Sequence, residues 1–531
     1  MQFNLADLFE TVVDTVPERI ALVSGDERVS FADLDARATR AAKLLRERGV
    51  KAGQHVGLHL YNGCAFVELM IACFKLRAVP INLNYRYVPA ELAYLVGNAD
   101  LVAVATQQEL APVMFEALQS GDSVHTTLVV ADDSGVDVSG HDAIDYGAAT
   151  LDYSADRDFE PRSGDDLYVV YTGGTTGMPR GVMWRHEDVF FAALQGGNPG
   201  DDPIERPEDL GPNVLDRDPM VIHPAAPLIH GAAQFSFWIA SLTGGKVVFV
   251  PGRSFIASES WRLMEREQVG VVNVVGDAMA RPLAECPGDF DTSHLYCVAS
   301  AGAILSKSVK ATLEARLPDC MILNNFGASE VGHQGTAMYD DDDEDARPRF
   351  FMKPGTAILG PDYKPVPVGT RGYIARTGRI PLGYYNDPAK TARTFKMIDG
   401  ERWVIPGDMG IADEDGFVDL LGRGAVCINT GGEKVFPEEV EEALKGHEAV
   451  MDCLVVGIPD SKWQERVGAV IQLRDGVDAS VESIDAFCRT KVAGYKAPRA
   501  YHFVEAIARH PSGKPDYRWA RDLAVARESA S

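Results

Sequence analysis

The feature that most constrains the fold of this chain is an alternation of helix-like and strand-like segments through roughly its first 350 residues. An amphipathic pattern predicts a helix over Phe31 to Arg48. The run Val56 to Leu60 then predicts a strand, followed by a second helix, Ala65 to Leu76. A further strand-like run, VVNVV, covers Val271 to Val275. Such alternation is typical of α/β layers built on mainly parallel sheet. We therefore predict an α/β fold.

The pattern changes near Gly355, where short strands separated by turns begin, as in GTRGYIARTGRI. After Arg423 comes a compact α+β tail that holds a predicted helix, EEVEEALK, and a predicted strand, VVGIPD. A chain of 531 residues is too long for one ordinary domain. We predict a large N-terminal domain over residues 1–422 and a smaller C-terminal domain over 423–531.

The formal charge of −26 disfavours binding to nucleic acid or to an anionic membrane surface, because both are negatively charged themselves. No apolar run approaches the about 20 residues that span a bilayer. The N-terminal stretch also lacks the basic region and apolar core of a signal peptide. The eight cysteines form no Cys-x-x-Cys pair, which argues against a zinc-like cluster and a disulfide framework. We expect a cytoplasmic protein with reduced thiols, and a homodimer stays open.

Two stretches are predicted to be loops. One, Gly196 to Asp218, is rich in Gly, Pro and Asp, and the other is the acidic run Asp340 to Asp345. A block of like charges usually forms a solvated loop, with a regulatory or ion-binding role as the alternative.

The segment most informative about function is LYVVYTGGTTGMPRGV, Leu167 to Val182. Five residues predicted to form a buried strand lead into a glycine-threonine loop, after which Arg180 follows. The loop residues are Thr172, Gly173, Gly174, Thr175, Thr176 and Gly177. Glycines let successive backbone N–H groups curl around an anion, the hydroxyls add donors, and the cation balances charge. This combination favours a triphosphate-binding loop over a surface turn. It is not a Walker A loop, so a P-loop NTPase is disfavoured.

The stretch YTGGTTGMPRGV resembles the signature of the adenylate-forming superfamily, which includes acyl-CoA synthetases, nonribosomal-peptide adenylation domains and luciferases. That signature usually has Lys where this chain has Arg180, so a planar fork replaces an ammonium. Further matches in the family's order extend the resemblance over nearly the whole chain. The resemblance implies an N-terminal domain of layered α/β subdomains with a small β-barrel-like part, and a C-terminal domain that is mobile.

The resemblance also implies a nucleotide site around NNFGASE, which is similar to the family's Asn-x-Tyr-Gly-x-Thr-Glu element. By that resemblance Asn324 bonds the adenine amino group and Phe326 stacks on the ring. Ser329 would contact the α-phosphate, and Glu330 would hold Mg²⁺, an ion that favours carboxylate and phosphate oxygens. The other residues assigned to the nucleotide by resemblance are Asn325 and Gly327 in this element, Gly302 and Ala303 beside adenine, and Asp408 and Arg423 at the ribose.

The last resemblances lie in the C-terminal part. Lys514, in HPSGKPDY, is similar to the lysine that bridges the acyl carboxylate and the α-phosphate during adenylation, although a lone lysine in such a loop is usually solvated. The segment GRGAVCINTGGEKVFPEEVE resembles the hinge and thiol tunnel of the family. Val426 stands there in place of the usual charged pivot, and Gly431 and Gly432 would leave room for the pantetheine arm of coenzyme A.

The acyl pocket is the least defined part of the sequence. His230 resembles a gate residue of the family, with a buried structural histidine as the alternative. The small residues Gly231, Ala232, Ala233 and Gly276 leave room for a bulky or long acyl chain. No Asp follows His230 in AAQFSFW, which argues against an amino acid as substrate. Trp184 and His186 are expected to pack the helix after the loop rather than to catalyse.

The leading hypothesis is an acyl-CoA synthetase that uses ATP, Mg²⁺ and coenzyme A, with Lys514, Glu330, Ser329 and His230 at the reaction centre. Its substrate would be an apolar carboxylic acid: medium- or long-chain, aromatic, or a steroid side chain. Two segments, GMPRGVMWRHEDVFFA and CINTGGEKVFPEEVEEALK, look like actinobacterial fatty-acyl and steroid-side-chain CoA synthetases. The alternatives are an adenylating enzyme with another acceptor, such as a carrier protein or oxygen, and a catalytically silent nucleotide-binding homologue.

Overall fold

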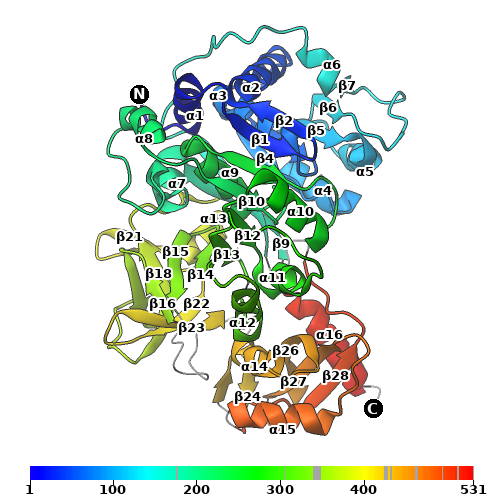
Figure 1. The fold of residues 1–531 in the computed structure, drawn as a ribbon, viewed down its shortest axis with the longest axis vertical. Coiled ribbons are helices and arrows are strands. Elements are labelled where there is room, and N and C mark those ends of the chain that lie inside the picture. Colours follow the sequence, from blue (N-terminus) through cyan, green and yellow to red (C-terminus); the bar gives the residue numbers. More distant parts are fainter. Residues whose placement is uncertain are drawn as a thin grey trace.

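The computed structural model describes residues 1–174, 177–303, 305–338, 349–423, 428–430, 433–460, 464–492, 494–510 and 514–529. Within them the strands form four sheets, three in the large N-terminal part and one in the C-terminal part (Figure 1). Helices flank the N-terminal sheets, so the α/β class predicted from the alternating pattern is confirmed.

The largest sheet has one half that is parallel except for an antiparallel edge strand, and one half that is antiparallel. The first half runs, in spatial order, through β2 (Glu27–Ser30), β1 (Ile20–Ser24), β11 (Lys246–Phe249), β10 (Val221–Pro224), β12 (Val271–Val274), β13 (Cys297–Ala301) and β14 (Met321–Ala328). The second half continues through β15 (Gly332–Met338), β16 (Arg349–Met352), β23 (Phe417–Arg423), β22 (Asp408–Ala412), β18 (Arg371–Thr377), β21 (Glu401–Val404) and β20 (Phe395–Ile398), and β17 (Thr356–Leu359) pairs with β18. The part expected to be barrel-like is this antiparallel extension.

Two smaller sheets complete the N-terminal part. One is parallel throughout and contains β4 (Val79–Asn82), β3 (His55–His59), β5 (Leu101–Gln107), β6 (Thr126–Val130) and β7 (Ile144–Asp145). The other is antiparallel and contains β19 (Gly383–Tyr384), β9 (Gly177–Arg185) and β8 (Leu167–Gly174). The predicted phosphate loop is therefore the tip of the β8–β9 hairpin.

The helices of the N-terminal part are α1 (Leu5–Thr15), α2 (Phe31–Glu47), α3 (Cys64–Lys75), α4 (Pro89–Asn98), α5 (Ala111–Leu118), α6 (Tyr146–Thr150), α7 (His186–Ala192), α8 (Leu210–Asp216), α9 (Gly231–Leu242), α10 (Ala257–Glu267), α11 (Gly276–Glu285), α12 (Lys307–Arg316) and α13 (Pro388–Thr394). An aromatic cluster at the centre of the core joins several of them to β8. Phe74 of α3 contacts Tyr168 of β8 and Trp238 of α9, at ring-centroid distances of 5.4 and 5.8 Å. All three side chains are buried, so this cluster fixes α9 against the sheets.

The C-terminal part has its own sheet and its own buried apolar clusters. The sheet contains β25 (Glu433–Val435), β24 (Ile428–Thr430), β27 (Gln464–Leu473), β26 (Val450–Asp460) and β28 (Ala500–Val504). It is covered by α14 (Pro437–Lys445), α15 (Val481–Lys491) and α16 (Tyr517–Ser529). Figure 1 shows this unit in orange and red below the N-terminal part, next to α11 and α12. The last strand before it ends at Arg423, and the division of the chain between residues 422 and 423 stays a prediction.

One local prediction needs correction. The stretch Gly196 to Asp218 is not all loop, because α8 forms within it and buries Leu210 and Val214 against the core. Trp184 is buried near the end of strand β9, just before α7 begins at His186. The acidic run Asp340 to Asp345 lies outside the described residues. No helix in the described part of the chain is long and apolar enough to cross a membrane.

Candidate active site

A cavity of about 750 Å³ lies between the parallel half of the large sheet, α9 and the β14–β15 hairpin. It has two ends of different character. At one end Thr172, Gly302, Ser329 and Lys514 line it, so four segments that are far apart in the sequence meet there. We call this the nucleotide end. The remainder is lined mostly by apolar side chains, and we call it the acyl end.

Lys514 reaches the nucleotide end from the C-terminal part of the chain. Its neighbour Gly302 has φ +81°, in the left-handed region, and a Cβ added there would lie 3.9 Å from the Lys514 Cε atom. The His510 N–H donates to the Lys514 carbonyl at 2.9 Å. The structure therefore brings the lysine and the glycine turn together, as the resemblance implied. Ala303 follows Gly302 and packs against the core.

Ser329 and Glu330 occupy the turn between β14 and β15. The indole N–H of buried Trp184 donates to the Ser329 carbonyl at 2.9 Å, and the Tyr384 hydroxyl donates to Glu330 Oε1 at 2.8 Å. Trp184 thus positions the turn, a role that the sequence did not reveal. Among the described residues no group of three or more His, Cys, Asp or Glu could hold a metal by itself. A single glutamate suits Mg²⁺ only when phosphate oxygens complete its coordination, which fits an ion that arrives with ATP.

The residues assigned to adenine lie on or beside β14. Asn324 is buried in that strand, whereas Asn325, Phe326 and Gly327 line the cavity. The Phe326 ring contacts Phe350 with centroids 6.0 Å apart, so one edge of the ring is held. The role of these side chains toward a nucleotide stays a prediction.

The residues assigned to ribose are direct neighbours across two antiparallel strands. Asp408 at the start of β22 pairs with Arg423 at the end of β23. The sequence places them 15 positions apart (423 − 408), and only the hairpin between the two strands sets them opposite each other.

The phosphate loop is only partly described. Gly173 and Gly174 end β8, Gly177 begins β9, and Thr175 and Thr176 lie outside the described residues. Arg180 pairs with Thr172 across the hairpin, and its Nε atom donates to Asp387 Oδ2 at 3.0 Å. Its guanidinium is therefore engaged by a carboxylate in this arrangement. The contribution of Arg180 to phosphate binding stays a prediction.

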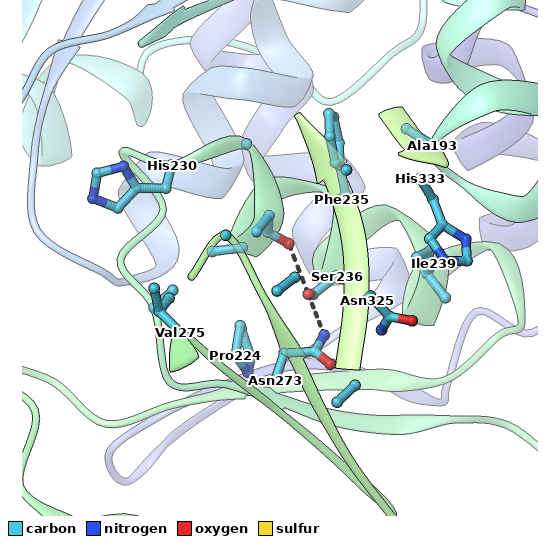
Figure 2. A pocket seen from close by; sticks show the side chains of 18 of the residues that line it. Ala193, Pro224, His230, Phe235, Ser236, Ile239, Asn273, Val275, Asn325 and His333 are labelled. Carbon is cyan, nitrogen blue, oxygen red and sulfur yellow. Dashed lines mark hydrogen bonds between the residues drawn. The ribbon is translucent and has the colours of Figure 1, made fainter. Parts of the chain in front are cut away.

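The acyl end is built on one face of four parallel strands (Figure 2). Side chains two residues apart on a strand point to the same face, so each strand contributes alternate residues. These alternate residues of β10, β12, β13 and β14 are Ile222 and Pro224; Val271 and Asn273; Cys297, Ala299 and Ala301; and Met321, Leu323 and Asn325. Val274 of β12 and the last three residues of β14, Phe326, Gly327 and Ala328, also line the cavity. The facing wall is α9 with Ala232, Phe235, Ser236 and Ile239, at the spacing of one helix face. Small residues on β13 leave the space between the two walls open.

His230 is half-buried at the N-terminal end of α9 and lines the cavity, where Figure 2 shows it on the same side as Val275. Its backbone N–H donates to the Pro227 carbonyl at 3.0 Å. Its imidazole thus borders the acyl end, a position that suits the gate predicted from the sequence. His186 is different, because it is buried and its Nδ1 accepts from the Leu5 N–H at 3.2 Å, a structural role.

Polar side chains inside the acyl end were not identified from the sequence. The Asn273 amide donates to Ser236 Oγ at 2.5 Å. On another wall His333 contacts Thr336 Oγ1 at 3.1 Å, and Thr336 donates to Asn325 Oδ1 at 2.8 Å. Burial, with Lys353 and Arg376 nearby, lowers the pKa of His333 to about 4, so its ring is neutral near pH 7. One signal was present in the sequence: VVNVV places an Asn in an otherwise apolar strand.

The C-terminal part contacts the N-terminal part through buried charges on α14. The Lys445 ammonium lies 3.6 Å from both Asp277 of α11 and Asp452 of β26. Burial alone would lower the pKa of Lys445, but these two carboxylates outweigh it and raise the pKa. The Lys307 N–H of α12 donates to Glu442 Oε1 at 2.9 Å. These contacts hold the small unit in the orientation that delivers Lys514. The hinge and thiol-tunnel residues Val426, Gly431 and Gly432 lie outside the described residues.

Comparisons with known proteins agree with this architecture. The family model described as "AMP-binding enzyme" matches residues 9–385, and the model described as "AMP-binding enzyme C-terminal domain" matches residues 439–514. A 3-oxocholest-4-en-26-oate–CoA ligase of Rhodococcus rhodochrous is 44% identical, with 98% of this chain and 96% of that protein covered. A medium/long-chain-fatty-acid–CoA/3-oxocholest-4-en-26-oate–CoA ligase of Mycobacterium tuberculosis (strain ATCC 25618 / H37Rv) is 42% identical, with coverage of 99% and 96%.

Solved structures share the fold at low identity. The anthranilate CoA ligase AuaEII in complex with anthranoyl-AMP has a TM-score of 0.85 at 21% identity, with 99% of this chain and 98% of that chain covered. A benzoate CoA ligase from Burkholderia xenovorans LB400 has a TM-score of 0.82 at 20% identity, with coverage of 98% and 100%. Together with the two matching models and the full-length relatives, these findings show that the chain belongs to the AMP-binding enzyme family.

Proposed function

We propose that this protein is an AMP-forming acyl-CoA ligase for apolar carboxylic acids. The observation that carries the proposal is the cavity itself, in which Lys514, Gly302 and Ser329 meet at the mouth of an apolar pocket. An acid bound with its tail at the acyl end presents its carboxylate beside the lysine. A nucleotide held by the glycine turn places its innermost phosphate at the same point.

The chemistry follows from that placement. A carboxylate oxygen of the acid attacks the α-phosphorus of ATP. The bond between this phosphorus and the oxygen that bridges to the β-phosphate breaks. Pyrophosphate departs, and the product is an acyl-adenylate. Negative charge grows at this phosphorus, where the Lys514 ammonium and the backbone N–H groups of the β8–β9 tip stabilise it. Mg²⁺, held by Glu330 and phosphate oxygens, would neutralise further charge on the triphosphate. In a second step the thiol of coenzyme A attacks the acyl carbon, loses its proton, and AMP departs.

The proposed substrate class rests on the acyl end and on relatives. A cavity of about 750 Å³ with small side chains on β13 accommodates a long or bulky apolar body. Two relatives with full-length similarity are named for medium- or long-chain fatty acids and a steroid acid. A fatty acid or a steroid side-chain acid is therefore the class that we propose for this chain.

The same proposal has three further parts. The acyl acceptor is coenzyme A, the protein is located in the cytoplasm, and the two domains divide between residues 422 and 423. The inter-part contact of Lys445 with Asp277 supports a C-terminal domain that docks for adenylation, and its release would allow thiol entry. Thioester formation needs such a rearrangement, because Lys514 occupies the nucleotide end in the docked arrangement.

The test is acid-dependent release of AMP, measured with ATP and Mg²⁺ and either coenzyme A, a carrier protein or no acceptor. The panel contains short, long, aromatic and steroid acids. We expect AMP release to be fastest with the most apolar of these acids and to require coenzyme A. Product formed only on the carrier protein would establish the alternative acceptor. Absence of acid-dependent exchange between ATP and pyrophosphate would show a silent nucleotide-binding homologue.

A further inference from the structure

Two amide side chains interrupt the apolar floor of the acyl end. Asn273 on β12 pairs with Ala299 on β13, which pairs with Leu323 on β14, and Asn325 lies two residues beyond Leu323. With strands about 4.8 Å apart and about 3.3 Å per residue, the two asparagine Cα atoms lie roughly 12 Å from each other. Figure 2 shows Asn273 with its hydrogen bond to Ser236, and Asn325 on the side of the pocket nearer His333.

Ser236 fixes the orientation of Asn273. The serine hydroxyl has one proton, which it donates to the Ala232 carbonyl at 2.8 Å. It can therefore only accept from Asn273, whose amide nitrogen donates at 2.5 Å. The Oδ1 acceptor and the second N–H of Asn273 have no other hydrogen bond to the described residues. The amide is held at one atom and offers the others to the cavity.

A directional chain fixes Asn325 in the same way. Thr336 donates its single hydroxyl proton to Asn325 Oδ1 at 2.8 Å. Its oxygen lies 3.1 Å from His333 Nε2 and accepts from that nitrogen in the tautomer that carries the proton there. Neither N–H of the Asn325 side-chain amide donates to a residue in the described part of the chain. An amide fixed at its oxygen thus presents two donors at the cavity wall.

The two amides lie at different depths. Asn325 pairs with Ala301, the residue before Gly302, and so lies beside the carboxylate position near Lys514. Asn273 is level with Ala299, two residues before Ala301 on β13, so it lies roughly 7 Å deeper along the strands than Asn325. A buried donor or acceptor without a partner costs about 1–3 kcal/mol, so an apolar tail that covered both amides would bind at a penalty.

We propose that Asn273, oriented by Ser236, and Asn325, oriented by Thr336 and His333, select acids that carry a carbonyl or hydroxyl oxygen within the apolar body. This deepens the proposed function and rests on it. The two N–H donors of Asn325 suit an oxygen close to the carboxylate. The acceptor and donor of Asn273 suit an oxygen in the middle of the substrate. A plain alkyl acid satisfies neither amide.

The experiment compares kcat/KM for dodecanoate with kcat/KM for a set of twelve-carbon oxo acids whose ketone occupies successive positions. We expect the wild-type enzyme to prefer at least one oxo acid over dodecanoate by about tenfold, the value of one buried hydrogen bond of about 1.4 kcal/mol. Asn273→Leu should abolish the preference for mid-chain ketones, and Asn325→Leu should abolish the preference for ketones near the carboxylate.

Positioning is tested with near-isosteric changes. Thr336→Val breaks the chain of hydrogen bonds from His333 to Asn325. It should lower severalfold the ratio of kcat/KM for an oxo acid to kcat/KM for dodecanoate. His333→Leu should lower this ratio as well, whereas His333→Gln keeps a donor and should retain most of it. The control Ile322→Val changes the opposite, buried face of β14, which does not line the cavity, and should leave the ratio within about twofold. KM for ATP is measured in parallel, because a rise in that value alone would assign Asn325 to the nucleotide and overturn its role in the acyl end.

The outcomes separate this inference from the proposed function. A wild-type preference for dodecanoate over every oxo acid would overturn the selection, and so would a preference for oxo acids that survives in both asparagine variants. No AMP release with any acid would instead remove the proposed function. An asparagine variant could lose activity with all acids. In that case Thr336→Val and Ser236→Ala, which leave both asparagines in place, test the selection instead.

Discussion

At the nucleotide end of the cavity, short motifs and backbone turns converge from four parts of the chain, whereas the acyl end is lined by alternate residues of four strands and one face of a helix. We propose that the first set binds a triphosphate through N–H groups, one ammonium and one carboxylate. We propose that the second set shapes the site for a substrate tail through side-chain volume and a few oriented amides. The difference explains why contiguous motifs predict the nucleotide end, whereas the acyl end depends on residues spread over several elements.

The largest expected effect is at the nucleotide end. Lys514→Ala should lower acid-dependent ATP–pyrophosphate exchange by about a hundredfold to a thousandfold, or about 3–4 kcal/mol, because it removes one preorganised charge from the reacting phosphorus. Conversion of synthetic acyl-AMP to acyl-CoA should persist, since that step does not use the charge. Lys491→Ala, on exposed α15, is the matched control. An equal loss in both half-reactions would contradict the separation of the steps.

Glu330→Gln tests the metal-holding carboxylate at the same end. It should lower the exchange rate by about a hundredfold and shift the Mg²⁺ concentration for half-maximal rate upward, because an amide binds the ion poorly. Tyr384→Phe removes only the hydroxyl that donates to Glu330 and should cost severalfold. A titration of rate against Mg²⁺ measures both variants. Identical Mg²⁺ curves for wild type and Glu330→Gln would exclude the metal role.

At the acyl end, Ala299→Leu should sharpen the comparison. The added methyl and methylene groups would fill the space between β13 and α9, so kcat/KM for a long acid should fall about tenfold and that for a short acid much less. KM for ATP should stay within about twofold, since the nucleotide end is untouched. Initial rates with two acids of different length, each at varied ATP, provide the test. A parallel fall for both acids would place Ala299 outside the tail path.

The smallest effect concerns stability rather than turnover. The pKa of His333 is lowered to about 4 in the folded protein, by burial and by Lys353 and Arg376, against an ordinary value near 6.5. Between these values the unfolded chain binds a proton that the folded chain does not, so the free energy of unfolding falls as pH drops below 6.5. From about pH 7 to 5.5 the loss from this residue should be about 1 kcal/mol.

The variant His333→Gln should therefore flatten the dependence of Tm on pH across that window. It should not abolish it, because His186 and His223 are also buried and their pKa values are lowered to about 4 by burial. His223 donates from Nδ1 to the Val248 carbonyl, and its neutral ring accepts at Nε2 from the Ser260 hydroxyl, away from the cavity. An unchanged slope in His333→Gln would show that His333 is already accessible to protons in the folded protein.

The sequence predicted several elements to within a residue or two. The helix expected over Phe31 to Arg48 is α2, Phe31–Glu47, and the strand expected over Val271 to Val275 is β12, Val271–Val274. Periodicity succeeded there because burial of one face dictates it. It failed at α8, where a stretch rich in Gly, Pro and Asp still forms a helix because Leu210 and Val214 pack against the core. Tertiary contacts outweighed local composition.

The candidate site divides in the same manner. Contiguous motifs predicted the family, which the comparisons show, and the glycine-threonine loop, Ser329, Glu330 and Lys514, whose roles stay predictions. Trp184 was expected only to pack, and nothing local reveals that strand β9 also places its indole N–H at the Ser329 carbonyl. Asn273, Ser236 and His333 lie on three elements and share no motif, so only the folded chain could join them.

By itself the sequence determined the α/β class, the order of the nucleotide-binding motifs and the family, because local periodicity and contiguous motifs are written along the chain. The tertiary structure decided which residues from different elements meet: Lys514 with Gly302, Tyr384 with Glu330, and two amides with their orienting hydroxyls. The physical reason is that hydrogen-bond direction and cavity shape depend on side chains from distant segments, whose relative positions arise only when the sheets and helices pack.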